Sequence, residues 1–284
     1  MRLQRFDAAA DFHAQAEAFL ARREAEHNLL LGICAGLIAH PERTERPPYL
    51  ATVDHEGEVV VAAVMTPPRA PVLSLLAAPE ALALLAADLY AFDPARPGVL
   101  GPASVSLAFA AEWQRLSGRS YHKRFAQRIY QLEAVMPVTG VPGRLRRAEQ
   151  ADRDLVTRWI LAFSAEAMGE SDPRGAERAV DSRLDSATAG LYLWENGNGG
   201  PVSLAGYSGP TPRGIRVGPV YTPPASRGHG YASACVAALS QLLLDGGRRY
   251  CFLFTDLANP TSNRIYQQIG YRPVCDVDEY RFTF

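Results

Sequence analysis

The chain has little of what marks several classes of protein. Its 284 residues carry a formal net charge of −1, whereas a protein that binds a nucleic-acid backbone needs a basic excess. The four cysteines, Cys34, Cys235, Cys251 and Cys275, are scattered without the spacing of a metal site. We therefore expect no nucleic-acid partner and no bound metal, and we interpret the cysteines as reduced residues that mostly serve packing.

Long apolar segments are also missing. The most apolar window, Val72 to Ala91, contains Pro79, Glu80 and Asp88, so it is no lipid-spanning helix and predicts a strand followed by a helix. The first seven residues lead into an amphipathic helix and lack the apolar core of a secretory signal. We expect a cytoplasmic protein that neither spans nor binds a membrane.

The most informative segment is the junction at residues 218–232, where an apolar strand passes through two prolines into a glycine-spaced turn. This turn, residues 227–232, is called the phosphate turn below. The N–H groups in the first turn of the helix that follows have no helical partners, and the peptide dipoles there favour an anion. Glycine also lets a ligand approach the main chain. The junction predicts a pyrophosphate site, although an ordinary tight connection has the same composition.

Three elements are predicted after the turn. A helix over 229–245 has Val236, Leu239 and Leu243 on one face and ends at two glycines. An unbroken apolar run over 250–254 is typical of a strand buried on both faces. A short helix then begins after Asn259, which suits the N-cap, and ends at Gly270.

These residues resemble the GNAT superfamily of acyl-CoA-dependent N-acyltransferases, in particular its glycine N-acyltransferase-like branch. The match to the family's turn pattern is Arg227, Gly230 and Ala232. The match to its later pattern is Asn259, Ser262, Tyr266, Gly270 and Tyr271. The resemblance covers residues from about 144 to 284 well and the first half only in outline.

The resemblance implies transfer of an acetyl group from acetyl-CoA, or of another acyl group from its own CoA thioester, to a primary amine by direct attack in a ternary complex. Tyr266 is the implied acid that protonates the departing thiolate; the alternative is a tyrosine that only packs its ring. The implied cofactor contacts are main-chain groups of Val220, Tyr221 and Thr222, the turn residues Arg227, Gly228, His229, Gly230, Tyr231 and Ala232, and the helix residues Asn259 and Asn263. For Arg227, pairing with a phosphate and holding the turn are both open.

A general base is harder to assign. The family often uses a glutamate on or near the strand before the turn, but residues 215–222 contain no carboxylate. Glu166, Glu170 and Asp256 are candidates by position alone. The prolines and glycine of this strand predict that it bends and separates from its neighbour, which leaves a slot for the pantetheine arm.

The two halves of the chain repeat one pattern. The first half opens with a predicted helix that has Phe12, Ala16, Phe19 and Leu20 on one side, and the second opens with one that has Leu155, Trp159 and Phe163 on one side. Hairpins are predicted over 49–65 and over 190–207, and residues 136–143 form a linker rich in Pro and Gly. We expect a degenerate domain over 1–135 and a catalytic domain over 144–284. The first half has no glycine over 76–85, where the second has its turn, so we expect only the second to bind CoA.

The predicted fold class is therefore α/β, with tandem GNAT-like domains that each have a mixed, mostly antiparallel sheet flanked by helices. Two other functions stay open at this point. The alternatives to an acetyltransferase are a sensor or interaction module that binds acyl-CoA without turnover and, less in keeping with the balanced charge, an aminoacyl transferase that uses charged RNA. The amine acceptor, a small molecule or a peptide, and the oligomeric state cannot be read from the sequence.

Overall fold

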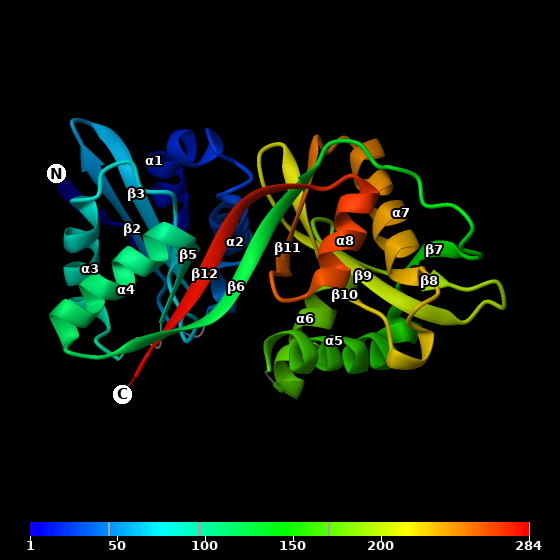
Figure 1. The fold of residues 1–284 in the computed structure, drawn as a ribbon. Helices are drawn as coiled ribbons and strands as arrows, with labels where there is room; N and C mark the ends of the chain where they lie inside the picture. The colour runs from blue at the N-terminus through cyan, green and yellow to red at the C-terminus, as the bar shows by residue number, and fades with distance from the viewer. Residues whose placement is uncertain (45, 96–97, 170, 284) are drawn as a thin grey trace. The chain divides into compact units, whose positions relative to one another are not determined.

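The computed structural model describes residues 1–44, 46–95, 98–169 and 171–283 (Figure 1). The chain divides into two units. The N-terminal unit comprises Met1–Ile129, Asp256–Ala258 and Val274–Phe284, and the C-terminal unit comprises Tyr130–Thr255 and Asn259–Pro273. These units are not the linear ranges 1–135 and 144–284, because the last strand of the chain packs with the N-terminal unit.

Both halves of the chain follow one order: a strand, two helices, three strands, a helix, a strand, a helix and a strand. In the first half these elements are β1 (Arg2–Arg5), α1 (Ala9–Ala21), α2 (Asn28–Ala39), β2 (Tyr49–His55), β3 (Glu58–Met65), β4 (Val72–Leu73), α3 (Ala81–Phe92), β5 (Gly98–Pro102), α4 (Ala103–Ser117) and β6 (Tyr121–Leu132). In the second half they are β7 (Arg144–Arg147), α5 (Arg153–Met168), α6 (Pro173–Leu184), β8 (Gly190–Glu195), β9 (Pro201–Pro210), β10 (Gly214–Tyr221), α7 (Tyr231–Asp245), β11 (Tyr250–Asp256), α8 (Pro260–Ile269) and β12 (Arg272–Phe282). The shared order supports an internal repeat.

Each unit has a mixed sheet. The strand order is β1-β2-β3-β4-β5-β12-β6 in the N-terminal unit and β6-β11-β10-β9-β8-β7 in the C-terminal unit. The pairs β4–β5 and β10–β11 are parallel, whereas β1–β2, β2–β3, β7–β8 and β8–β9 are antiparallel. The predicted mixed, mostly antiparallel architecture is confirmed.

The last strands of the two halves are exchanged. β12 pairs antiparallel with β5 from Val277↔Pro102 to Arg281↔Gly98, while the end of β6 contributes residues 130–132 to the C-terminal unit beside β11. In the N-terminal unit, β12 supplies carboxylates and β6 supplies cations. Their ion pairs are Lys123–Asp278 at 2.6 Å, Arg124–Glu279 at 3.2 Å and Arg128–Asp276 at 2.6 Å. Opposite charges across the two strands favour this pairing and register.

Helices cover both faces of each sheet because successive strand residues point to opposite sides. In the N-terminal unit, Tyr49, Ala51 and Val53 of β2 pack with α3 and α4, whereas Leu50 packs with α1 and α2. In the C-terminal unit, Ile215 of β10 packs with α7 and α8 on one face. The other face carries α5 and α6.

The structure changes two details of the sequence prediction. α7 begins at Tyr231 rather than at residue 229, because Gly230 has a left-handed φ of 77° and ends the turn instead of starting the helix. On α5 the fully buried residues are Val156 and Ile160, not the expected face of Leu155, Trp159 and Phe163. Trp159 and Phe163 pack at the margin of the core.

The other predicted elements are confirmed. The two hairpins are β2–β3 and β8–β9, the apolar window is β4 followed by α3, and α8 lies between the N-cap Asn259 and Gly270. The cysteines are unpaired, and all but Cys275 are buried. Within the residues that the structure describes, no helix has both the length and the apolarity needed to cross a membrane.

Candidate active site

The phosphate turn connects the end of β10 to α7. A short 3-10 helix, Pro224–Ser226, precedes it, and Gly228 and Gly230 have φ of 83° and 77°. Residues other than glycine rarely adopt such left-handed φ angles. Among the described residues, no backbone acceptor is found for the N–H groups of 228–233; the first helical bond is from Ala234 N to Gly230 O, 3.0 Å. The turn therefore presents several free N–H donors at a helix N-terminus.

The two glycines of the turn have different surroundings. A Cβ on Gly228 would meet nothing within 4 Å, whereas a Cβ on Gly230 would lie 2.9 Å from Cγ2 of Val141. Val141 belongs to the linker, which is bonded to the rest of the C-terminal unit through Met136 N to Ile269 O, 2.7 Å, and Trp194 Nε1 to Pro142 O, 3.3 Å. Gly230 is thus explained by packing as well as by a ligand, while the open side of the turn is at Gly228.

The strands β10 and β11 pair only at their start. Their parallel register runs from Gly214↔Tyr250 to Arg216↔Phe252, although β10 continues to Tyr221 and β11 to Asp256. The register of β10 against β9 shifts between Val217 and Val220. The expected bend and separation of this strand are both found, and the unpaired edge leaves main-chain groups of 217–222 for a ligand.

The shift in β10 also re-aims a side chain. Ile215 and Val217 face α7 and α8, and an uninterrupted strand would place Tyr221 on that same face. Gly218 and Pro219 lie opposite the single residue Gly206 of β9, and this one extra residue reverses the alternation, so Tyr221 packs instead beside α5 and α6. Bulges commonly redirect a side chain in this way.

Tyr221 meets a charged cluster at the end of β10. Its hydroxyl donates to Oε1 of Glu166 on α5 at 3.2 Å, and an Arg227 Nη nitrogen donates to Oε2 of Glu166 at 2.6 Å. Arg227 Nε also donates to the carbonyl of Thr222 at 2.8 Å. Burial, and then the charge of Glu166, raises the pKa of Tyr221 above its usual value. In this state Arg227 holds the turn through a carbonyl and a carboxylate, one of the two roles open from the sequence.

Tyr266 lies on α8 with its ring in the core that α7 and α8 cover. The side chain is buried, and its ring contacts that of Tyr271 edge-on with centroids 6.0 Å apart. Burial raises the pKa of Tyr266 to about 12. The phenol is protonated at neutral pH, as an unshifted tyrosine also is, and the raised pKa makes it a weaker proton donor.

The two asparagines predicted near the cofactor have partners within the protein. Asn259 accepts from Ser262 N at 3.0 Å, which is the N-cap bond of α8. Asn263 accepts from the hydroxyl of Tyr130 at 2.9 Å and donates to the carbonyl of Asn259 at 2.7 Å. Tyr130 was not predicted, because nothing in the sequence of β6 distinguishes it from a packing residue. Cofactor contacts by the asparagines stay a prediction.

The remaining turn residues and candidate bases differ in setting. His229 is exposed, and its ring lies 5.5 Å from that of the half-buried Tyr231, while Ala232 is half-buried at the start of α7. Asp256 accepts from Ala258 N at 2.8 Å, as expected of a turn cap. Glu170 lies outside the described residues. Of the two candidate bases that the structure describes, Glu166 is the one that lies at the end of β10.

Two further polar residues fix the end of β10. Ser203 Oγ on β9 lies 2.8 Å from Thr222 Oγ1 and 3.3 Å from the carbonyl of Tyr221. The sequence carried no signal for this contact, because it depends on the shifted register of β9 and β10. Within the described residues there is no cluster of side chains suited to a metal ion.

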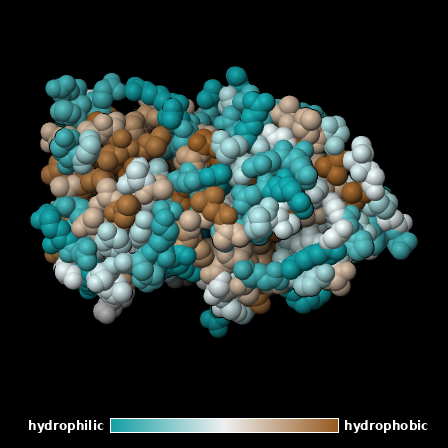
Figure 2. Space-filling view, in the orientation of Figure 1, coloured by the Kyte–Doolittle hydropathy of each residue, from teal (hydrophilic) through white to brown (hydrophobic). Residues whose placement is uncertain are grey.

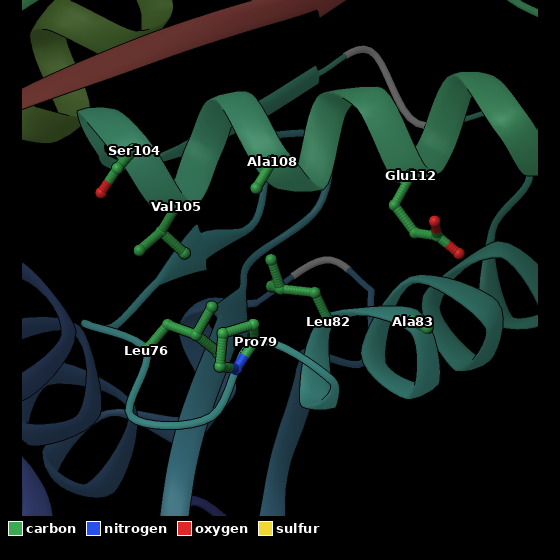
Figure 3. Close-up of a pocket in the computed structure, with 8 residues that line it drawn as sticks. All are labelled: Leu76, Pro79, Leu82, Ala83, Ser104, Val105, Ala108 and Glu112. Atoms are coloured by element: carbon green, nitrogen blue, oxygen red, sulfur yellow. The ribbon is translucent and has the colours of Figure 1, made fainter.

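The N-terminal unit has an apolar pocket where its loop enters α3. The cavity has a volume of about 410 Å³, and Leu82 of α3 and Val105 of α4 point into it (Figure 3). It is lined by Leu76, Pro79, Leu82, Ala83, Ser104, Val105, Ala108 and Glu112. Figure 2 shows hydrophobic residues on the viewer's side of this unit. This loop therefore presents apolar side chains where the C-terminal unit presents free N–H groups.

Comparison with known families matches residues 156–271 to the acetyltransferase (GNAT) family. The fold is the GNAT fold. The matched residues extend from α5 to the end of α8 and contain the phosphate turn, the separated strands and Tyr266. The GNAT-like N-terminal half lies outside the match. A comparison with curated proteins finds no match.

Solved structures resemble the chain over nearly its whole length. A Drosophila protein has a TM-score of 0.67 at 12% identity, covering 99% of this chain and 98% of its own. A GCN5-related N-acetyltransferase from Sphaerobacter thermophilus has 0.61 at 16%, covering 99% and 94%. A tandem GNAT protein from the clavulanic acid biosynthesis pathway has 0.58 at 15%, covering 99% and 98%. At these identities the likeness concerns the GNAT fold alone.

Proposed function

We propose that the C-terminal unit transfers an acetyl group from acetyl-CoA to a primary amine. The observation that carries this proposal is the set of free N–H groups over 228–233. They follow directly after β10, whose residues beyond Arg216 are not paired with β11. Donors at a helix N-terminus suit a diphosphate, and the open edge of β10 suits the amide groups of a pantetheine arm. The match of residues 156–271 to an acetyltransferase family supports the same reaction.

The residues suit direct transfer. The amine nitrogen forms a bond to the thioester carbon, the carbon–sulfur bond breaks, and sulfur takes the hydroxyl proton of Tyr266. The proton lost by the amine returns to the phenolate through water, so charge and atoms balance. In this reaction a main-chain N–H of Val220, Tyr221 or Thr222 stabilises the thioester oxygen as it gains charge. The protein acts in the cytoplasm, in keeping with its unpaired cysteines.

Titration calorimetry with acetyl-CoA, followed by a thiol-release assay with a panel of primary amines, tests the proposal. We expect one acetyl-CoA site per chain and free CoA thiol that appears only with an amine. Two sites per chain would contradict the restriction to the C-terminal unit. Tight binding with no thiol release from any amine would support the acyl-CoA sensor instead.

A further inference from the structure

Glu166 is a carboxylate held by a cation of the phosphate turn itself. Its Oε2 lies 2.6 Å from a terminal nitrogen of Arg227, and the two side chains are 49% and 48% exposed. An ion pair this open to water contributes little to stability. A competing partner can therefore replace either member at small cost.

A bound diphosphate would compete with Glu166 for the side chain of Arg227. Arg227 directly precedes the free N–H groups of 228–233, so a diphosphate bound there lies within reach of its side chain. Guanidinium pairs strongly with phosphate oxygens, and turning its planar fork toward them competes with its bond to Glu166. Binding of the diphosphate thus favours release of the carboxylate.

Glu166 keeps one partner when Arg227 leaves. Tyr221 donates its hydroxyl to Oε1, and Tyr221 is fixed by packing in the α5–α6 core and by ring contact with Trp159, centroids 6.3 Å apart. The carboxylate is thereby oriented while Oε2 is freed. It then stands beside the end of β10, where the proposed reaction places the thioester.

We propose that Glu166 binds the ammonium group of the acceptor, and that Arg227 occupies this position until acyl-CoA draws it away. The inference rests on the proposed acyl transfer and adds the acceptor class, a primary amine that is cationic when it binds and that loses this proton to water before its nitrogen attacks the thioester. Guanidinium and ammonium make the same kind of charged hydrogen bond to a carboxylate, so Arg227 is an internal stand-in for the substrate.

This arrangement couples the two substrates. If acyl-CoA removes Arg227 from Glu166, the acceptor binds more tightly to the acyl-CoA complex than to the free protein. By thermodynamic reciprocity the acceptor also tightens acyl-CoA by the same factor. The strength of the ion pair sets the scale of this effect at roughly two- to five-fold.

The first test measures acetyl-CoA binding by calorimetry in four proteins: wild type, Glu166→Gln, Arg227→Met and the double variant. Glu166→Gln frees Arg227, so we expect the dissociation constant to fall roughly two- to five-fold. In the Arg227→Met background the same substitution should have no effect, because the competing guanidinium is gone. The exposed Glu177→Gln on α6 serves as the matched control and should change nothing.

The second test uses the thiol-release assay with the amine that turns over, at saturating acetyl-CoA. We expect Glu166→Gln to raise KM for the amine roughly ten-fold and to lower kcat much less. An unchanged KM, or an acetyl-CoA dissociation constant unaffected by Glu166→Gln, overturns the inference and leaves acyl transfer intact. A wild-type protein that binds no acetyl-CoA overturns the proposed function and this inference together.

Discussion

The two units share one order of elements and differ where the chain leaves the fourth strand of each half. In the C-terminal unit that strand, β10, spans eight residues, contains a register shift and runs into a turn with two left-handed glycines. In the N-terminal unit it is β4, two residues long, and the loop to α3 has no glycine. A single fold thus carries an anion-binding junction in one copy and an apolar surface in the other.

A second difference lies on the helix after the fifth strand. Tyr266 is the seventh residue of α8, and the seventh residue of α4 is Phe109. Both side chains are buried in the core of their own unit. The N-terminal copy therefore lacks both the glycine turn and the phenol. The comparison teaches that the proposed chemistry depends on two local features, while the sheet and helices around them are common to both copies.

The largest effect is expected from giving α8 the phenylalanine that α4 has at the corresponding position. Tyr266→Phe removes the acid but keeps the ring, so kcat should fall by roughly 10²-fold while the dissociation constant of acetyl-CoA stays the same. Steady-state kinetics and calorimetry measure the two quantities. An unchanged kcat would remove Tyr266 from the mechanism.

Tyr271→Phe is the matched control for Tyr266→Phe. The Tyr271 hydroxyl lies 2.8 Å from Ser240 Oγ inside the same core. Its loss should lower the free energy of unfolding by about 1 kcal/mol and leave kcat intact. If both substitutions reduce kcat equally, packing rather than proton donation explains the effect.

The next effect concerns the turn. Asp and Asn both tolerate left-handed backbone angles, and the space beside Gly228 is open. Gly228→Asp should weaken acetyl-CoA binding roughly ten-fold relative to Gly228→Asn, because only the carboxylate repels a diphosphate. Ala77→Asp, on the corresponding loop of the N-terminal unit, should leave binding unchanged. A loss of affinity in that variant would indicate a cofactor site in the N-terminal unit and would contradict the restriction to the C-terminal unit.

The smallest expected effect is a difference between the two units in the pH at which acid begins to lower their stability. His27 in the N-terminal unit accepts from Leu75 N through Nε2, 3.0 Å, and lies 2.9 Å from the carbonyl of Leu20 through Nδ1. These partners require the neutral ring. Burial lowers the pKa of His27; the hydrogen bond to Leu20 and the charge of Glu26 oppose the shift, and Arg23 adds to it. The unfolded chain therefore binds more protons below about pH 6.5, and the unit loses stability as pH falls from there.

The C-terminal unit should resist acid longer. Hydrogen bonds from Arg146 lower the pKa of both Asp152 and Glu195, so their contribution persists until pH falls below about 4. Urea midpoints followed through Trp113 for one unit, and through Trp159 and Trp194 for the other, measure the difference. Equal loss in both units between pH 6.5 and 5 would contradict it.

Much of the fold was predictable because its signals are local. Alternating apolar residues gave both hairpins, and Asn259 and Gly270 marked both ends of α8. The apolar face of α5 was misplaced by one residue, because Trp159 and Phe163 are large enough to lie at the margin of the core while Val156 and Ile160 fill its centre.

The candidate site was predictable only in part. Glycine spacing identified the turn, since positive φ angles demand it. The cluster of Glu166, Tyr221 and Arg227 was not predicted, because it depends on a register shift that reverses the side of Tyr221 and on contacts between residues 55 and 61 positions apart. Val141 beside Gly230 likewise depends on the path of the linker.

The exchanged strands have a consequence for how this chain can be divided. A break within residues 136–143 would leave the first fragment with β6, whose end extends the other sheet, and the second with β12, which fills a gap beside β5. We expect neither fragment to fold alone, but the two fragments together contain all the strands of both sheets. Co-produced fragments should assemble into a nicked protein, whereas each alone should expose unsatisfied strand edges and aggregate.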